Sequence, residues 1–308
     1  MGDKKSAWRR LSSMQAFLRL SLIVAIILSC TVWHAPEARC GTSEIKLPLE
    51  IPLQFDGGMP TVEVMVNGKG PFVFGFDTGA QAGPRLDTSL VEKLALKSSG
   101  QVQAIDPSGR NPQNSETYKL ESISIGALRL SDVTVAGRNY RNSPRPLKVD
   151  GILGLNPLAD YLVTLDFPGG NLVLAKGELP KADGKDIFDY KNAAGVAELD
   201  LSVGDKKIKA HLDSGNAIGA FVFPTAFAEK LRFAGEPRVV GRARSASGEM
   251  EIKQVQLKDV VKLGRHEFPD AAIVYPALGE IANVGLKTLS QFVVTFDQKN
   301  ERVRLIRP

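Results

Sequence analysis

The feature that most constrains the fold of this chain is a short motif that occurs twice, each time at the end of an apolar run. The first copy reads FGFDTGA at residues 74–80, and the second reads AHLDSGN at residues 210–216. Asp, Thr, Ser and Gly are common turn residues, so a single copy could simply mark the end of a strand. By chance, however, Asp-Ser/Thr-Gly is expected only about 0.1 times in a chain of this length. Two copies therefore indicate a duplicated unit.

A longer alignment supports the duplication. Residues 62–96 align with residues 197–233, and each segment contains an alternating strand, a Gly-containing turn, a second strand, the motif and a segment with helical spacing. Further along, residues 154–166 align with residues 285–297 without a gap. Short strands dominate both halves, and long helical periods are scarce. We therefore expect a mainly β fold made of two lobes of common ancestry.

The order of these segments also predicts the domain organisation. A length of 308 residues is sufficient for two lobes with substantial cores. The stretch KGELPKADGKD is polar and contains Pro and Gly, which is typical of a connection between domains. We expect a leader at residues 1–40, a first lobe at residues 44–178, a linker at residues 179–186 and a second lobe at residues 187–308.

The leader has the pattern of a secretory signal or a membrane anchor. Five basic residues precede the apolar stretch LSLIVAIILSCTV at residues 20–32, which is short for a membrane span and suits a signal core. Small residues before Gly41 suit an ordinary signal peptidase, whereas Cys30 lies in an imperfect lipoprotein box. We expect a protein of the bacterial envelope, periplasmic or secreted. Its membrane contact would be limited to the leader or to a lipid on Cys30.

Charge and composition exclude several other classes of function. The first 40 residues carry six of the 39 basic side chains and two of the 34 acidic ones, so the remaining chain has a net charge of only +1. This balance lacks the basic surplus of nucleic-acid binding. Both cysteines lie in the leader, and only His211 and His266 follow it. A thiol nucleophile and a His-rich metal site are therefore not expected, and we predict no metal and no cofactor.

The duplicated motif resembles that of the aspartic proteases of the pepsin and retropepsin clan. Each copy is followed by an apolar-apolar-Gly signature, ILG at residues 152–154 and NVG at residues 283–285, where Asn283 departs from the pattern. The spelling DTGA and the short lobes are similar to the retropepsin-like proteins of bacterial envelopes. The resemblance covers roughly residues 45–308. It implies two β-barrel-like lobes with short helices, an interlobe cleft and a polypeptide substrate.

The chemistry of peptide hydrolysis explains why both copies are needed. Without a covalent intermediate, one carboxylate must deprotonate water while a second, protonated carboxyl polarises the carbonyl. Two carboxyls about 3 Å apart cannot both ionise, so they share one proton. The candidates are Asp77 and Asp213. The residues expected to support them are Thr78, Gly79, Ala80, Ser214, Gly215 and Asn216.

These supporting residues have distinct expected roles. The hydroxyls of Thr78 and Ser214 can hold the two loops together, and the glycines allow a sharp turn beneath the pair. Ala80 has no donor for the carboxylate, although Asn216 could supply an amide N–H in the second lobe. We therefore expect best activity in mildly acidic to near-neutral conditions.

The resemblance also implies a β-hairpin that closes over the substrate. We expect its tip at Ser108 and Gly109, with a matching turn at Ser247 and Gly248 in the second lobe. An ordinary loop at these positions is the alternative. The aromatic residue of a pepsin flap tip has no evident counterpart, because Tyr118 lies nine residues beyond Gly109.

Two functions remain open at this point. The first is an exported aspartic endopeptidase, and the second is a catalytically inactive peptide-binding or scaffolding module on the same fold. The presence of both aspartates favours the enzyme. Since one chain supplies both motifs, we expect a monomer.

Overall fold

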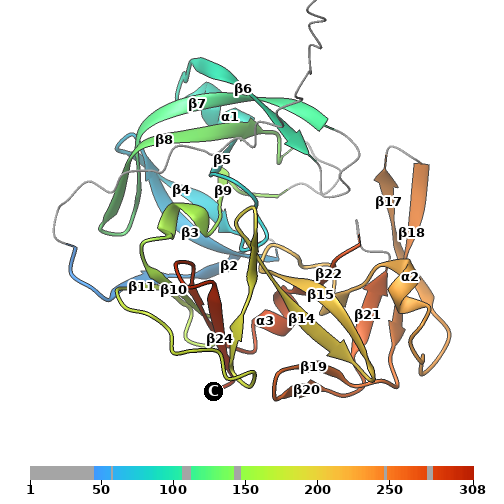
Figure 1. Cartoon of the computed structure of the whole chain (residues 1–308). Helices are drawn as coiled ribbons and strands as arrows, with labels where there is room; N and C mark the ends of the chain where they lie inside the picture. The colour runs from blue at the N-terminus through green and yellow to red at the C-terminus, as the bar shows by residue number, and fades with distance from the viewer. Residues whose placement is uncertain (1–44, 57, 106–111, 142–146, 246–247, 276–279) are drawn as a thin grey trace, which may run out of the picture. The chain divides into compact units, whose positions relative to one another are not determined.

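The structure is a computed structural model that describes residues 45–308 except residues 57, 106–111, 142–146, 246–247 and 276–279. Strands form most of it (Figure 1). The helical segments are α1 (Thr88–Lys93), α2 (Thr225–Ala228), α3 (Leu286–Leu289) and the 3-10 helix η1 (Asn156–Leu158). Within these described ranges, no helix has the length and apolar character needed to span a membrane.

The first-lobe sheet has eight strands in the order β2-β3-β4-β9-β5-β8-β7-β6. Strand β3 also pairs with β7, so the sheet partly closes on itself. The strands are β2 (Gln54–Asp56), β3 (Met59–Val66), β4 (Lys69–Phe76), β5 (Arg85–Asp87), β6 (Ser98–Ile105), β7 (Pro112–Ile125), β8 (Leu128–Arg138) and β9 (Gly151–Leu153).

The second-lobe sheet has ten strands, and its pairing order repeats that of the first. Along its main path the order is β17-β18-β21-β16-β22-β15-β14-β19-β20, and β13 pairs with β14. The strands are β13 (Lys191–Ala193), β14 (Val196–Val203), β15 (Lys206–Asp213), β16 (Phe221–Val222), β17 (Arg238–Ser245), β18 (Gly248–Gln256), β19 (Val261–Leu263), β20 (His266–Phe268), β21 (Ala272–Tyr275) and β22 (Ala282–Gly285).

The correspondence between the two sheets confirms the expected mainly β fold with two matching lobes. The path β3-β4-β9-β5-β8-β7-β6 of the first lobe matches β14-β15-β22-β16-β21-β18-β17 of the second. In both lobes the strand that leads into the motif pairs in parallel with a later strand, β4 with β9 and β15 with β22. Each motif therefore lies at the end of an interior strand.

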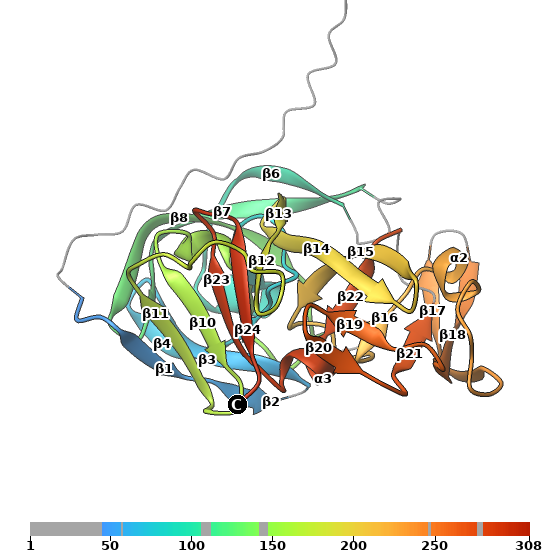
Figure 2. The same cartoon turned by 60° about the horizontal axis from the view of Figure 1, so that its bottom comes forward.

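A third sheet combines strands from both halves of the chain, which the sequence analysis did not anticipate. Its order is β1-β11-β10-β23-β24-β12, and Figure 2 shows the red strands β23 and β24 beside β10. At its centre Thr164 lies opposite Thr295, with their hydroxyl oxygens 2.9 Å apart. These two threonines are equivalent positions of the repeat. The strands are β1 (Leu49–Pro52), β10 (Leu162–Asp166), β11 (Asn171–Ala175), β12 (Ile187–Asp189), β23 (Val293–Asp297) and β24 (Arg302–Ile306).

Alternating apolar residues build the core beneath the motifs. On β4, the rings of Phe74 and Phe76 are fully buried directly before the first motif, and each contributes roughly 1.5–3 kcal/mol by leaving water. On β8 the alternation of buried residues shifts by one at Asp132, which has a φ of 55° and interrupts the otherwise regular pairing with β7. The motif loops therefore project from rigid, well-packed strands.

The predicted linker contains no helix or strand in the structure. Its first residue is nevertheless held in place, because Leu179 N donates to Asp297 Oδ2 at 2.9 Å and Leu179 O accepts from Arg302 Nη1 at 2.9 Å. The exact lobe boundaries remain a prediction.

Candidate active site

The two motif aspartates occupy equivalent places at the ends of β4 and β15. Asp77 follows β4 and its backbone N donates to Leu153 O of β9 at 2.9 Å. Asp213 ends β15 and lies opposite Gly285 of β22. The two carboxyl groups hydrogen-bond to one another. The structure thus brings together two acids that are 136 positions apart in the chain.

The motif hydroxyls tie the two loops together by reciprocal hydrogen bonds. Thr78 N donates to Ser214 Oγ at 3.0 Å, and Ser214 N donates to Thr78 Oγ1 at 2.9 Å. Each hydroxyl then donates to the opposite strand, Thr78 Oγ1 to Leu212 O and Ser214 Oγ to Phe76 O, both at 2.8 Å. Both hydroxyl residues are fully buried. This set of four bonds fixes the distance between the aspartates.

The motif glycines are required by the carboxyl group of the other lobe. A β-carbon on Gly79 would lie 2.6 Å from Asp213 Oδ1, and one on Gly215 would lie 2.6 Å from Asp77 Oδ1. Each glycine N–H also donates to the aspartate of its own loop, at 2.8 Å for Asp77 and 3.0 Å for Asp213. Only glycine permits both the close approach and the hydrogen bond.

The residue after each glycine differs in its contacts. Ala80 is buried in a small apolar cluster with Met59, Val149 and Ile152. Asn216, by contrast, donates through Nδ2 to Asn283 Oδ1 at 2.7 Å. Asn216 is thus connected to the second aspartate through Asn283.

The donor to the second aspartate is Asn283 of β22. Its Nδ2 donates to Asp213 Oδ2 at 2.6 Å. Sequence analysis did not place this residue in the site. The available signal was its departure from the apolar-apolar-Gly pattern, which left a polar side chain where the first lobe has Ile152.

Burial raises the pKa of both carboxyl groups. For Asp213 the negative charge of Asp77 adds to burial, and its pKa rises to about 8 although the hydrogen bond from Asn283 opposes the shift. For Asp77 burial is again the largest cause and raises the pKa, opposed by hydrogen bonds and by the positive charge of Arg85. Across the pH range between its two ionisations, the pair holds one shared proton.

Two further side chains lie near the first aspartate, and no motif marked them. Arg85 in β5 hydrogen-bonds to Tyr140 and donates through Nη2 to Gln81 O at 2.6 Å. Burial raises the pKa of Tyr140, so its phenol stays protonated near neutral pH. The positive charge of the Arg85 guanidinium lowers the pKa of Asp77.

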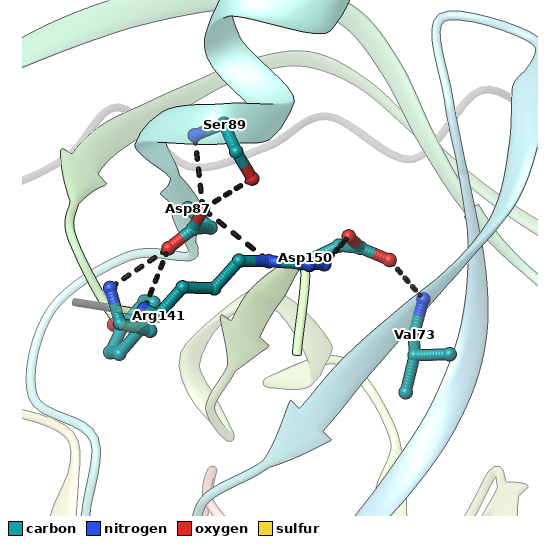
Figure 3. Close-up of polar contacts among 6 residues, drawn as sticks. Val73, Asp87, Ser89, Arg141 and Asp150 are labelled. Atoms are coloured by element: carbon teal, nitrogen blue, oxygen red, sulfur yellow. Dashed lines mark hydrogen bonds and ion pairs between the residues drawn. The ribbon is translucent and has the colours of Figure 1, made fainter. Parts of the chain in front are cut away.

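The buried aspartate Asp87, shown in Figure 3, anchors the segment that carries Tyr140. It caps α1 through Ser89 N at 2.9 Å, and it accepts from the backbone N of Tyr140 at 2.8 Å. Figure 3 also shows Arg141 reaching Asp150, with 2.8 Å between Nη2 and Oδ1. Burial raises the pKa of Asp87, but donors from Ser89, Tyr140 and Arg141 outweigh it and lower the pKa overall.

Each lobe also contains a long antiparallel hairpin of the kind expected for a flap. The pairing of β6 with β7 extends to Ile105 opposite Pro112. The pairing of β17 with β18 extends to Ser245 opposite Gly248. Gly248 therefore begins β18. The other expected tip residues, Ser108, Gly109 and Ser247, lie outside the described residues. Their role in covering a substrate remains a prediction.

Tyr118 belongs to the body of its hairpin. It lies in β7, is buried, and donates through its hydroxyl to Glu116 Oε2 at 2.8 Å. In the part of the chain that the structure describes, no group of three or more His, Cys, Asp or Glu side chains could hold a metal ion.

Comparison with known proteins gives one match. Residues 62–156 match the model of a family described as aspartyl protease, and no curated protein matches the chain. The matched stretch includes the first motif, with Asp77, and the signature at residues 152–154. The match therefore supports an aspartic protease family for this chain, through the lobe that contributes Asp77.

Proposed function

We propose that this protein is an exported aspartic endopeptidase in which Asp77 and Asp213 activate a water molecule. The observation that carries the proposal is the hydrogen-bonded carboxyl pair, with each acid held by the glycine N–H of its own loop. Buried carboxyls with raised pKa values are typical of functional sites. A purely structural role would not require two acids in contact.

The pair can supply both proton transfers that peptide hydrolysis needs. The ionised carboxylate accepts a proton from water, whose oxygen bonds to the scissile carbonyl carbon, while the protonated carboxyl gives its proton to the carbonyl oxygen. A tetrahedral diol results. The carboxyl that took the proton from water then gives it to the amide nitrogen, the C–N bond breaks as one diol hydroxyl returns its proton to the other carboxylate, and the pair is again singly protonated. The shared proton makes one member a base and the other an acid.

The substrate is proposed to be an extended polypeptide that binds by strand addition. A hollow of about 300 Å³ adjoins the second motif loop. It is joined to that loop through Ile218, whose N donates to Asn216 Oδ1 at 2.9 Å. It is lined by Ile218, Val240, Gly241, Ile252, Gln254 and Val274, and most of the lining surface that it exposes is polar. We expect this hollow to accept part of the substrate chain, and Val240→Asp to reduce cleavage.

Location and assembly follow from the sequence expectations. We propose export to the periplasm or beyond the cell, with membrane contact only through the leader or a lipid on Cys30. Because one chain supplies both aspartates, we propose a monomer whose specific activity does not fall on dilution. Specific activity that collapses at low protein concentration would contradict this.

The decisive experiment is cleavage of a diverse peptide library by the wild type and by Asp77→Asn. A matched control is Asp205→Asn, because Asp205 is an exposed acid in the turn between β14 and β15. We expect cleavage by the wild type and the control but not by Asp77→Asn. Undiminished cleavage by Asp77→Asn would refute the aspartic mechanism. Saturable peptide binding with no cleavage by any variant would instead identify a binding or scaffolding module.

A further inference from the structure

The second aspartate receives a directed chain of amide hydrogen bonds from two residues whose counterparts in the first lobe are apolar. Ile218 N donates to Asn216 Oδ1 at 2.9 Å, Asn216 Nδ2 donates to Asn283 Oδ1 at 2.7 Å, and Asn283 Nδ2 donates to Asp213 Oδ2 at 2.6 Å. We propose that Asn283 is a positioning residue that stabilises negative charge on Asp213, and that Asn216 holds its amide in the donating orientation. This inference deepens the proposed function and rests on it.

The direction of the chain is set at its start by a group that cannot reverse. An asparagine amide can present either its oxygen or its nitrogen to a neighbour. A backbone N–H can only donate, so the Ile218 N–H fixes which end of Asn216 is the oxygen. Asn216 must then present Nδ2 to Asn283, which leaves Asn283 Nδ2 for the carboxylate. Each bond thus enforces the next.

The equivalent positions of the first lobe are apolar. Ile152 of β9 corresponds to Asn283, and Ala80 corresponds to Asn216. Both belong to a buried apolar cluster that also contains Met59 and Val149. Asp77 accepts from Gly79 N and bonds to the other aspartate, and the positions equivalent to Asn216 and Asn283 supply it with no amide. The two carboxyls differ in their surroundings although their loops match.

Other titratable groups near the pair must be separated from this effect. In the first lobe, the charge of Arg85 lowers the pKa of Asp77, and the charge of Asp77 raises the pKa of Tyr140. In the second lobe, His211 lies opposite Asn283 in the pairing of β15 with β22 and is 3.7 Å from Glu198.

The remaining neighbours of Asn283 contribute little charge. Burial lowers the pKa of His211, so it is neutral near neutral pH. Strand β16 presents Val222 opposite Asn283, and Lys287 of α3 is exposed. A His211→Gln variant measures the contribution of the histidine directly.

The test is the pH dependence of the carboxyl pair in Asn283→Val, measured in two ways on the full chain. The first is the pH profile of kcat/KM with a cleaved peptide. The second is ¹³C NMR titration of the aspartate carboxyls, assigned with Asp77→Asn and Asp213→Asn. Loss of a donor to a carboxylate disfavours the ionised form, so we expect the midpoints and both limbs of the profile to move about one unit toward higher pH.

Matched variants distinguish this role from general damage. Ile152→Val places the same side chain at the equivalent first-lobe position and is expected to leave the midpoints unchanged. Asn216→Ala keeps Asn283 but removes the bond that orients it, so a smaller shift in the same direction is expected. Thermal unfolding at neutral pH checks that each variant folds. If Asn283→Val does not fold, the shift of the carboxyl midpoints in Asn216→Ala tests the role of Asn283 instead.

Unchanged midpoints in a folded Asn283→Val, or in Asn216→Ala if only that variant folds, would overturn the inference. An equal shift in Ile152→Val or a larger one in His211→Gln would also overturn it. Failure of the proposed function looks different. In that case the wild type cleaves no peptide, while the NMR midpoints still move in Asn283→Val.

Discussion

The two motif loops, residues 76–80 and 212–216, make equivalent contacts at four positions and different ones at the fifth. Thr78 and Ser214 exchange reciprocal bonds, and each glycine faces the carboxyl of the opposite loop. The side chains of the fifth residues are held within their own lobes, Ala80 by apolar packing and Asn216 by a hydrogen bond to Asn283. Contacts that cross between the loops are thus matched, whereas contacts within a lobe have diverged.

This difference has a physical reason. A cross-loop contact serves both halves at once, so a change on one side leaves a buried partner without its hydrogen bond. A contact within a lobe affects only one carboxyl. Divergence there gives the two acids different surroundings without disturbing their separation, which is what a base and an acid in one site require.

Apart from the loss of an aspartate itself, the largest expected effect comes from filling the space between the loops. Gly79→Ala and Gly215→Ala each place a methyl group against the opposite carboxyl. We expect each to reduce kcat/KM by at least about a hundredfold, because the pair can no longer share a proton. Steady-state assays with a library-derived peptide measure this. If one glycine tolerates alanine, the two loops are less equivalent than the structure indicates.

Removing one hydroxyl tests the reciprocity of the cross-loop bonds. Thr78→Val and Ser214→Ala each delete two buried hydrogen bonds and should reduce the free energy of unfolding by about 2–4 kcal/mol, to a similar extent in both. Thr78→Ser keeps the hydroxyl and is the control, with a loss expected below about 1 kcal/mol. Chemical denaturation gives these values. Strongly unequal losses of unfolding free energy would show that the hydroxyls of Thr78 and Ser214 are not equivalent.

The raised pKa of Asp213 predicts a stability that depends on pH. Because the folded-state pKa of about 8 lies above the unfolded value, this carboxyl favours the fold most at low pH, and that contribution is lost as the pH rises to about 8. Asp213→Asn removes this loss. The unfolding temperature of Asp213→Asn relative to that of the wild type should therefore rise by a few degrees from pH 5 to pH 9. The same difference for Asp205→Asn should stay constant. A constant difference for Asp213→Asn across this range would contradict the raised pKa.

The smallest expected effect comes from making the first loop more polar. Ala80→Ser offers a hydroxyl near Asp77, so the acid limb of the activity profile should move to lower pH by less than about one unit. The profile of the wild type should peak in mildly acidic to near-neutral conditions. A wild-type peak in strong acid, or an acid limb that does not move in Ala80→Ser, would contradict this.

The sequence predicted the parts of the site that are adjacent in the chain. Both aspartates, the two hydroxyls and the glycines lie within two short motifs, and the alternation of β4 and β15 leads directly into them. The pairing of the two lobes was predictable for the same reason, because duplicated segments carry duplicated patterns.

Residues that join the site through tertiary packing were not predictable. Asn283 lies 70 positions from Asp213, and the contacts of Arg85 with Tyr140 and of Asp87 with Arg141 carry no motif. The shared six-stranded sheet was also missed, since its strands look like ordinary ends of each lobe. Side-chain identity is visible in a sequence, but which long-range neighbour a polar group finds depends on the folded topology.

The most direct test of the central claim is a double-mutant cycle on the two aspartates. The kcat/KM of wild type, Asp77→Asn, Asp213→Asn and the double variant is measured on one peptide, with Asp205→Asn as the control. If the acids form one site with a shared proton, each single variant loses at least about a thousandfold and the double variant is no worse than either. Near-wild-type activity in either single variant, or losses that add in the double variant, would contradict the two-lobe site.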